Sequence, residues 1–157
     1  MNLKPLFNVL GALLTLLGIT MVVPIFISYF TEGYDLFGFI YSSLICISIG
    51  TPIWFFTRHN KSLNNKVGFA VVTFSWIFAA IGSSLPFYLS GAIPNYTDAF
   101  FESMSGVTTT GATIIGNPLT LPNLPDGIES LPYGILFWRS FIQWIGGMGI
   151  IVFYIAI

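Results

Sequence analysis

Four long apolar segments constrain the fold of this chain more than any other feature of its sequence. They run over Leu6–Phe30, Leu36–Phe56, Val67–Leu89 and Gly134–Ile157. Each is long enough for a helix that crosses a bilayer, which takes about 20 mostly apolar residues. Only 7% of the 157 residues are charged and 55% are hydrophobic, whereas a soluble domain has roughly 25% charged residues. The sequence therefore predicts an all-α integral membrane protein with four transmembrane helices.

Prolines and glycines in these segments indicate how the helices bend and pack. Pro24, Pro52 and Pro86 lie near the ends of the first three segments, and each should bend its helix or help to end it. Glycines in the same segments allow helices to approach closely. The single cysteine, Cys46, lies in an apolar run, and we expect it to be a small buried side chain.

Basic residues gather on two of the flanks, which predicts the orientation. Lys4 precedes the first segment, and a basic loop separates the second from the third, with Arg58, His59, Lys61 and Lys66. Positive flanks are cytoplasmic, so the N-terminus is expected inside, with the chain in the cell (inner) membrane. The acidic residues fall in the other two connections: Glu32, Asp35, Asp98, Glu102, Asp126 and Glu129. With a formal net charge of −1 and no basic run, the chain offers no surface for nucleic acid.

The connection between the third and fourth segments is patterned like a helix that enters the membrane halfway. A helix over Asp98–Val107 would be roughly 15 Å long, half the ~30 Å hydrocarbon thickness. Thr97 or Asp98 is expected to cap it. Its negative dipole end would point at the turn Thr108–Thr113. Non-helical backbone at that depth is tolerated when it lines a watery cavity or is buried in protein, which favours a re-entrant pore half-helix.

The turn itself is rich in oxygen ligands. Thr108, Thr109, Thr110 and Gly111 carry hydroxyls and carbonyls that can replace the water shell of a monovalent cation. A polar Ser/Thr/Gly turn in a membrane protein is also a common exterior loop, and that alternative remains open on composition alone.

Arg139 lies inside the fourth apolar segment, where a charged side chain normally has a partner. Counted from the expected helix starts at ~1.5 Å per residue, Glu102 and Arg139 lie at compatible depths of roughly 6 Å and roughly 9 Å. We predict an ion pair of forked geometry between them that holds the half-helix behind the filter, with Asp98 as the alternative partner. Arg139→Ala should reduce folded protein, and exchanging the two residues should restore part of it.

Two motifs in order resemble a known family. Phe101-Glu102-Ser103-Met104-Ser105-Gly106 with Thr108-Thr109-Thr110-Gly111-Ala112-Thr113, and Leu136-Phe137-Trp138-Arg139-Ser140-Phe141 with Gln143-Trp144-Ile145-Gly146-Gly147-Met148-Gly149-Ile150, are similar to the first pore domain of the Trk/Ktr potassium-uptake proteins, above all the TrkH branch. In that family four helix–pore loop–helix units in one chain surround a pore, and one glycine in each filter marks potassium preference. The resemblance implies that this glycine is Gly111, with potassium as the transported ion bound at Thr109, Thr110 and Gly111.

The resemblance also implies an organisation and a set of partners. Residues 1–66 would be an N-terminal transmembrane helix pair, and residues 67–157 the first helix–pore loop–helix unit. One unit cannot enclose a pore, and the chain is apolar to Ile157, so it reads as an N-terminal fragment. The expected partners are membrane lipid, the remaining pore units, a second copy in a homodimer and a cytosolic nucleotide-binding ring. We expect no cofactor besides the transported ion.

Two other classes of function compete with a potassium pore. A secondary transporter could bind another ion or a small solute at a re-entrant hairpin. A membrane enzyme would have to use Asp98 and Glu102, but no nucleophile–base pair, metal cluster or His accompanies them. We therefore do not expect an enzyme.

Overall fold

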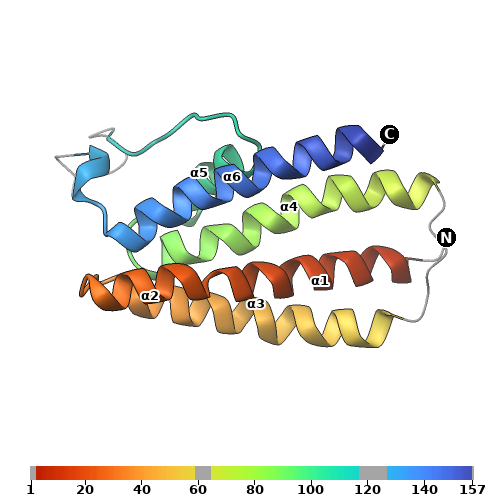
Figure 1. Ribbon diagram of the computed structural model, residues 1–157, viewed down its shortest axis with the longest axis horizontal. Helices are drawn as coiled ribbons and strands as arrows, with labels where there is room; N and C mark the ends of the chain where they lie inside the picture. Colours follow the sequence, from red (N-terminus) through yellow and green to blue (C-terminus); the bar gives the residue numbers. More distant parts are fainter. Residues whose placement is uncertain (1–2, 59–64, 117–126, 157) are drawn as a thin grey trace.

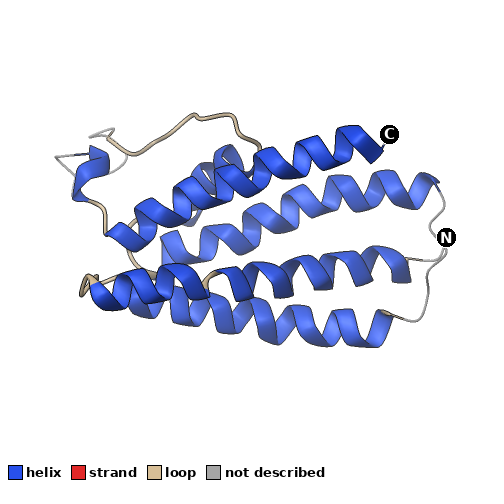
Figure 2. Cartoon of the chain, viewed as in Figure 1, coloured by secondary structure: helices blue, strands red, loops and turns tan. Residues whose placement is uncertain are grey.

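The computed structural model describes residues 3–58, 65–116 and 127–156, and this part of the chain contains helices and loops but no strand (Figure 2). His59, Lys61 and Asp126 lie outside it. The elements, in chain order, are α1 (Lys4–Thr20), α2 (Val22–Phe30), α3 (Leu36–Thr57), α4 (Asn65–Leu89), α5 (Tyr96–Val107), the 3-10 helix η1 (Gly127–Ser130) and α6 (Tyr133–Ala156).

Three stretches of the described chain are long and apolar enough to cross a membrane: Lys4–Phe30, Leu36–Thr57 and Val67–Leu89. α6, with 24 residues, would be about 36 Å long at about 1.5 Å per residue, enough to cross a bilayer. The all-helical membrane class predicted from the sequence is therefore confirmed. That α6 is the fourth span and that α5 re-enters the membrane remain predictions.

The first span is interrupted where its proline predicts. α1 ends at Thr20 and α2 begins at Val22, with Met21 between them. Pro24 has no N–H to donate to the carbonyl of Thr20, four residues earlier, and its ring crowds that carbonyl. Pro52 and Pro86 lie inside α3 and α4, so neither ends its helix at once.

α1 and α3 pack with their backbones in contact because glycines line the seam. A Cβ on Gly11 would lie 2.6 Å from the backbone nitrogen of Trp54 and 2.9 Å from the carbonyl oxygen of Gly50. Further along, the Ser43 hydroxyl donates to the carbonyl of Gly18 at 2.7 Å. The close approach predicted from the glycines is thus present, and it joins the two helices that precede α4.

The helices form a bundle in which α4 lies between the α1–α3 pair and α6 (Figure 1). Both termini lie at one end of the bundle, and the α2–α3 and α4–α5 links lie at the other. The end of the bundle with these two links holds a core of large side chains. Five of them are fully buried: Phe39, Phe87, Ile93, Ile135 and Trp138. α4 packs against α1 and α3 as well as α5, and a domain boundary at residue 66 remains a prediction.

Trp138 joins three helices in this core. Its Nε1–H donates to the carbonyl of Ser83 on α4 at 3.0 Å. Its ring meets Phe39 of α3 edge to face, with centroids 6.1 Å apart and planes at 80°. Cys46 is buried as expected, at 2% exposed.

Candidate functional site

α5 is a short helix that covers only part of the bundle's length (Figure 1). Its 12 residues would be about 18 Å long at about 1.5 Å per residue. Asn95 caps it, with Oδ1 accepting from the Thr97 N–H at 3.0 Å. The predicted cap at Thr97 or Asp98 is therefore wrong, because the helix begins at Tyr96 and both residues lie in its first turn. Asp98 still favours the positive end of the dipole.

The turn after α5 has two residues with left-handed backbone. Thr109 has φ of +56° and Gly111 has φ of +76°. Gly adopts this conformation without the steric cost that a Cβ brings, whereas Thr adopts it only when its surroundings impose it. The left-handed backbone at Gly111 suits a glycine, and Thr109 adds a second twist to the same turn.

Hydrogen bonds within the loop hold this conformation. The Thr110 N–H donates to the carbonyl of Ser105 at 3.0 Å, and the Ser105 hydroxyl donates to the carbonyl of Ala112 at 2.6 Å. The hydroxyls of Thr108 and Thr110 are 2.8 Å apart. Ser105 thus binds the turn on both sides of Gly111, while Thr110, Gly111 and Ala112 remain exposed.

Glu102 connects the loop to α6. Its side chain is 1% exposed, and it accepts hydrogen bonds from the Thr113 hydroxyl at 2.9 Å and 3.0 Å and from the Ile114 N–H at 3.1 Å. Arg139 Nε lies 2.5 Å from Glu102 Oε1. The buried carboxylate is therefore satisfied from two directions, as buried charges normally are.

The predicted contact between Glu102 and Arg139 is formed, but its geometry differs from the expectation. The guanidinium contacts the carboxylate through Nε, and within the described residues no second, parallel hydrogen bond completes a fork. Thr113 and Ile114 both donate to the other carboxylate oxygen, Oε2. Asp98, the alternative partner, forms no ion pair in the described part of the chain.

The end of α5 rests on glycine in the middle of α6. A Cβ on Gly146 would overlap the carbonyl of Val107, and a Cβ on Gly106 would lie 2.7 Å from Ile142. Gly146 is 13 residues beyond Tyr133, so α5 ends roughly 20 Å along α6 at about 1.5 Å per residue. The turn therefore lies near mid-length of a helix long enough to span the bilayer.

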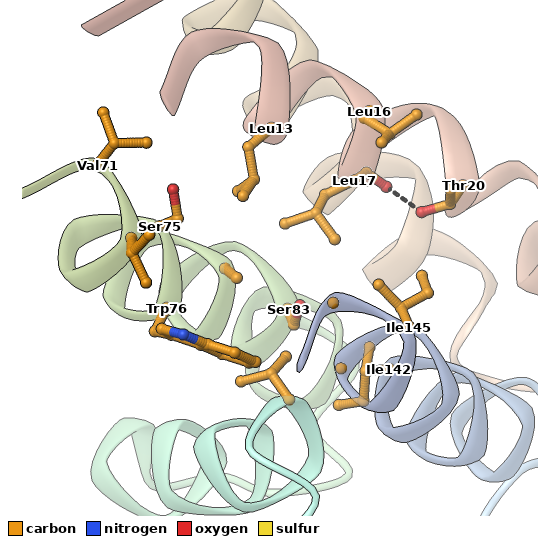
Figure 3. Close-up of a pocket in the computed structure, with 15 residues that line it drawn as sticks. Leu13, Leu16, Leu17, Thr20, Val71, Ser75, Trp76, Ser83, Ile142 and Ile145 are labelled. Carbon is orange, nitrogen blue, oxygen red and sulfur yellow. Dashed lines mark hydrogen bonds between the residues drawn. The ribbon is translucent and has the colours of Figure 1, made fainter. Parts of the chain in front are cut away.

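A separate cavity of about 420 Å³ lies between α1, α4 and α6 (Figure 3). Its wall is apolar apart from a few hydroxyls, and that of Thr20 donates to the carbonyl of Leu17 at 2.8 Å. No charged side chain lines it. Since a cation needs several oxygen ligands, the turn after α5 is the better candidate for an ion site.

Sequence reasoning identified the turn and the Glu102–Arg139 contact but missed the residues that brace them. These are Asn95, Ser105, Thr113 and Ile114, whose local hydrogen bonds no periodicity reveals. The clustering of hydroxyls around Gly111 is the one signal that could have pointed to Ser105 and Thr113. That Thr108, Thr109, Thr110 and Gly111 bind an ion remains a prediction.

A bundle of long apolar helices, with a short helix that ends at an exposed, oxygen-rich turn, defines a class of protein: helical membrane proteins. The family model "TrkH: Cation transport protein" matches residues 36–157. The chain belongs to this TrkH family of cation transport proteins.

Similar proteins agree with this assignment. The chain is 37% identical over 160 residues to the Trk system potassium uptake protein TrkH of Vibrio parahaemolyticus, covering 100% of this chain and 31% of that protein. It is 36% identical over 160 residues to TrkH of Escherichia coli K12, again covering 100% of this chain and 31% of the relative. It is 35% identical over 153 residues to an uncharacterized cation transporter of Methanocaldococcus jannaschii, covering 96% of this chain and 30% of the relative.

A solved structure shows the same fold. The crystal structure of the potassium transporter TrkH from Vibrio parahaemolyticus superposes with a TM-score of 0.85 at 36% identity, covering 99% of this chain and 32% of that one. The chain spans about a third of the length of these relatives.

Proposed function

We propose that this chain supplies one of four pore units of a potassium-uptake protein. The observation that carries the proposal is the left-handed backbone at Gly111, with φ of +76°, inside an exposed Thr-rich turn at the end of α5. A twist of this kind lets successive carbonyls turn toward one side of the chain, as an ion filter requires. The relatives named as potassium uptake proteins support the same ion.

The electrostatics of the turn suit a cation. The C-terminal end of α5 carries the negative end of the helix dipole, and no basic side chain lies between Asn95 and Gly116. Arg139 is the nearest charge of the wrong sign in sequence, and Glu102 binds it. Pairing offsets the positive charge of this guanidinium and so reduces its repulsion of the ion.

The rest of the assembly follows from the length of the relatives. One turn cannot surround an ion, because a ring of carbonyls takes contributions from about four loops. We propose that the missing units lie in the rest of the full-length chain. The proposal includes the inner membrane, a cytoplasmic N-terminus, a homodimer, surrounding lipid and a cytosolic nucleotide-binding ring.

Uptake of rubidium by the full-length protein tests this function. The protein is produced in bacterial cells that lack their own potassium uptake, and rubidium entry is measured with and without excess sodium or a second solute. We expect rubidium to enter without help from sodium. We also expect its entry to need no co-transported solute. Rubidium entry no faster than in cells without the protein, or entry that requires a second solute, would reject the proposal in favour of a different transporter.

A further inference from the structure

Asp35 is a buried carboxylate far from the filter turn. It lies between α2 and α3 and is 0% exposed, as is Ser28 on α2. Within the described chain, neither Asp35 carboxylate oxygen nor Ser28 Oγ has a partner with the geometry of a hydrogen bond. Burying a carboxylate in this way is unfavourable, so its surroundings are informative.

Asp35 stands at the N-cap position of α3 but does not cap that helix. Its side chain accepts no cap hydrogen bond there. The carboxylate is turned instead toward the first turn of α6. A Cβ on Gly134 would overlap both Asp35 Oδ2 and Ser28 Oγ.

This cluster of Ser28, Asp35 and Gly134, here called the α6 seat, is closed by protein atoms. A Cβ on Gly134 would also lie 3.1 Å from the ring of Phe39. On the other side, a Cβ on Gly33 would overlap Asp35 Oδ1. The seat is therefore buried, and its two polar side chains are packed against the start of a helix.

The position of that start affects the filter loop. Arg139 lies five residues beyond Gly134, on the same rigid helix, and it reaches Glu102, which in turn binds Thr113. We propose that Asp35 is a positioning residue of the pore unit: wedged with Ser28 against Gly134, it sets where α6 begins and so the depth at which Arg139 meets Glu102. This inference rests on the proposed function, because the effect of displacing α6 is measured as a change in the ratio of rubidium to sodium uptake.

Steric changes at Gly134 test the seat. In the full-length protein, Gly134→Ala should lower the ratio of rubidium to sodium uptake several-fold, because the new methyl displaces α6. Gly68→Ala is the matched control, since its Cβ would meet no described atom within 4 Å, and its ratio should match wild type. Adding Ser28→Ala to Gly134→Ala removes one of the two overlapping atoms and should restore part of the ratio.

Two changes at Asp35 separate positioning from general loss of structure. Asp35→Asn keeps the shape of the side chain and should keep the uptake ratio. Asp35→Ala empties the seat and should lower the ratio several-fold at equal amounts of inserted protein. The two Asp35 variants also test the inference if Gly134→Ala does not insert into the membrane. Wild-type ratios in Asp35→Ala, and in Gly134→Ala where it inserts, would overturn the inference.

A second measurement keeps the inference separate from the proposed function. If the wild-type full-length protein carries no rubidium, the proposed function fails, and amide hydrogen exchange of residues 133–139 in the purified protein tests the seat alone. Faster exchange in Asp35→Ala than in Asp35→Asn supports the seat. Equal exchange in the two variants overturns it.

Discussion

Arg139 and Glu102 join α6 to the short helix α5 through a contact of 2.5 Å between Nε and Oε1. The carboxylate is 1% exposed and the guanidinium side chain 22% exposed. Because Glu102 also accepts from Thr113 and Ile114, one acidic side chain connects α5, the returning limb of the loop and α6. Glu102 is buried in this connection, whereas Thr110 and Gly111 of the same loop are exposed.

Arg139→Ala should reduce the amount of folded full-length protein. The change leaves the Glu102 carboxylate buried without its counter-charge, a loss of about 3–5 kcal/mol in soluble proteins. Folded protein can be measured by size-exclusion chromatography of a fluorescent fusion in detergent. Ser140→Ala, at an exposed neighbouring position, is the control. Equal yields for the two variants would show that Arg139 does not stabilise the fold.

Exchanging Glu102 and Arg139 should not restore the yield of folded protein. Sequence reasoning predicted partial recovery for Glu102→Arg combined with Arg139→Glu, since the charges would still match. The structure argues against this, because the Thr113 hydroxyl and the Ile114 N–H both donate to residue 102. A guanidinium at that position offers only donors. Folded yield at or below that of Arg139→Ala is expected, and a higher yield would contradict this account of Glu102.

Thr113→Val should weaken the loop more than Thr113→Ser. Valine has a similar shape but removes the hydroxyl that donates to Glu102, and a hydrogen bond to a charged group contributes about 1.5–3 kcal/mol. Serine keeps the donor. Thermal unfolding of the purified full-length protein should show a lower midpoint for the valine variant alone. A lower midpoint of the same size in both variants would contradict this role of the hydroxyl, because serine keeps it.

Several of these relationships follow from the sequence, and the reasons differ. The Glu102–Arg139 pair could be predicted because a charge in an apolar segment needs a partner and depth can be counted along two helices. The break near Pro24 follows from the missing N–H. Thr113 and Asn95 could not be assigned, because loop paths and helix starts depend on single hydrogen bonds rather than on a repeated pattern.

Asp35 shows a different limit of sequence reasoning. An acidic residue in a short link between two apolar segments is normally solvated, and the sequence analysis placed Asp35 only among the acidic residues of the two connections without basic residues. Its burial depends on α6 packing onto the α2–α3 link, a contact between segments about 100 residues apart. Nothing in the local sequence distinguishes it from Glu32, which is exposed.

The stability of Asp35→Asn relative to the wild type should increase as pH rises. Burial raises the pKa of the Asp35 carboxyl above its ordinary 3.8, while the Ser28 hydroxyl and the Ile135 N–H oppose the rise in part. The folded protein therefore holds this proton more tightly than the unfolded protein. That contribution is complete below 3.8 and is lost as pH rises through the raised value.

The wild-type thermal midpoint should therefore fall relative to Asp35→Asn between pH 3.8 and neutrality. A gap that closes with rising pH would mean that the first turn of α6 stabilises the carboxylate more than burial penalises it.

Gly146→Ala should shift the end of α5. The new Cβ would overlap the carbonyl of Val107, whereas on Gly149 it would meet no described atom within 4 Å. We expect Gly146→Ala to lower rubidium uptake per inserted protein several-fold and Gly149→Ala to leave it unchanged. Equal uptake by the two variants would contradict the packing of α5 on α6.

Gly111 is the residue on which the proposed filter depends, and the chain contains a matched control for it. Gly111 and Gly91 have nearly the same φ, at +76° and +77°, and at both a Cβ would meet no described atom within 4 Å. Gly91 lies in the α4–α5 link, away from the turn. Serine at either position therefore carries the same backbone strain, but only Gly111→Ser alters the turn.

The most direct measurement is the ratio of rubidium to sodium uptake by the full-length protein with Gly111→Ser, compared with Gly91→Ser and wild type at equal membrane insertion. If Gly111 belongs to a potassium filter, the ratio falls several-fold in Gly111→Ser and stays at the wild-type value in Gly91→Ser. An unchanged ratio in Gly111→Ser, or an equal fall in both variants, would contradict the assignment of this turn as the filter.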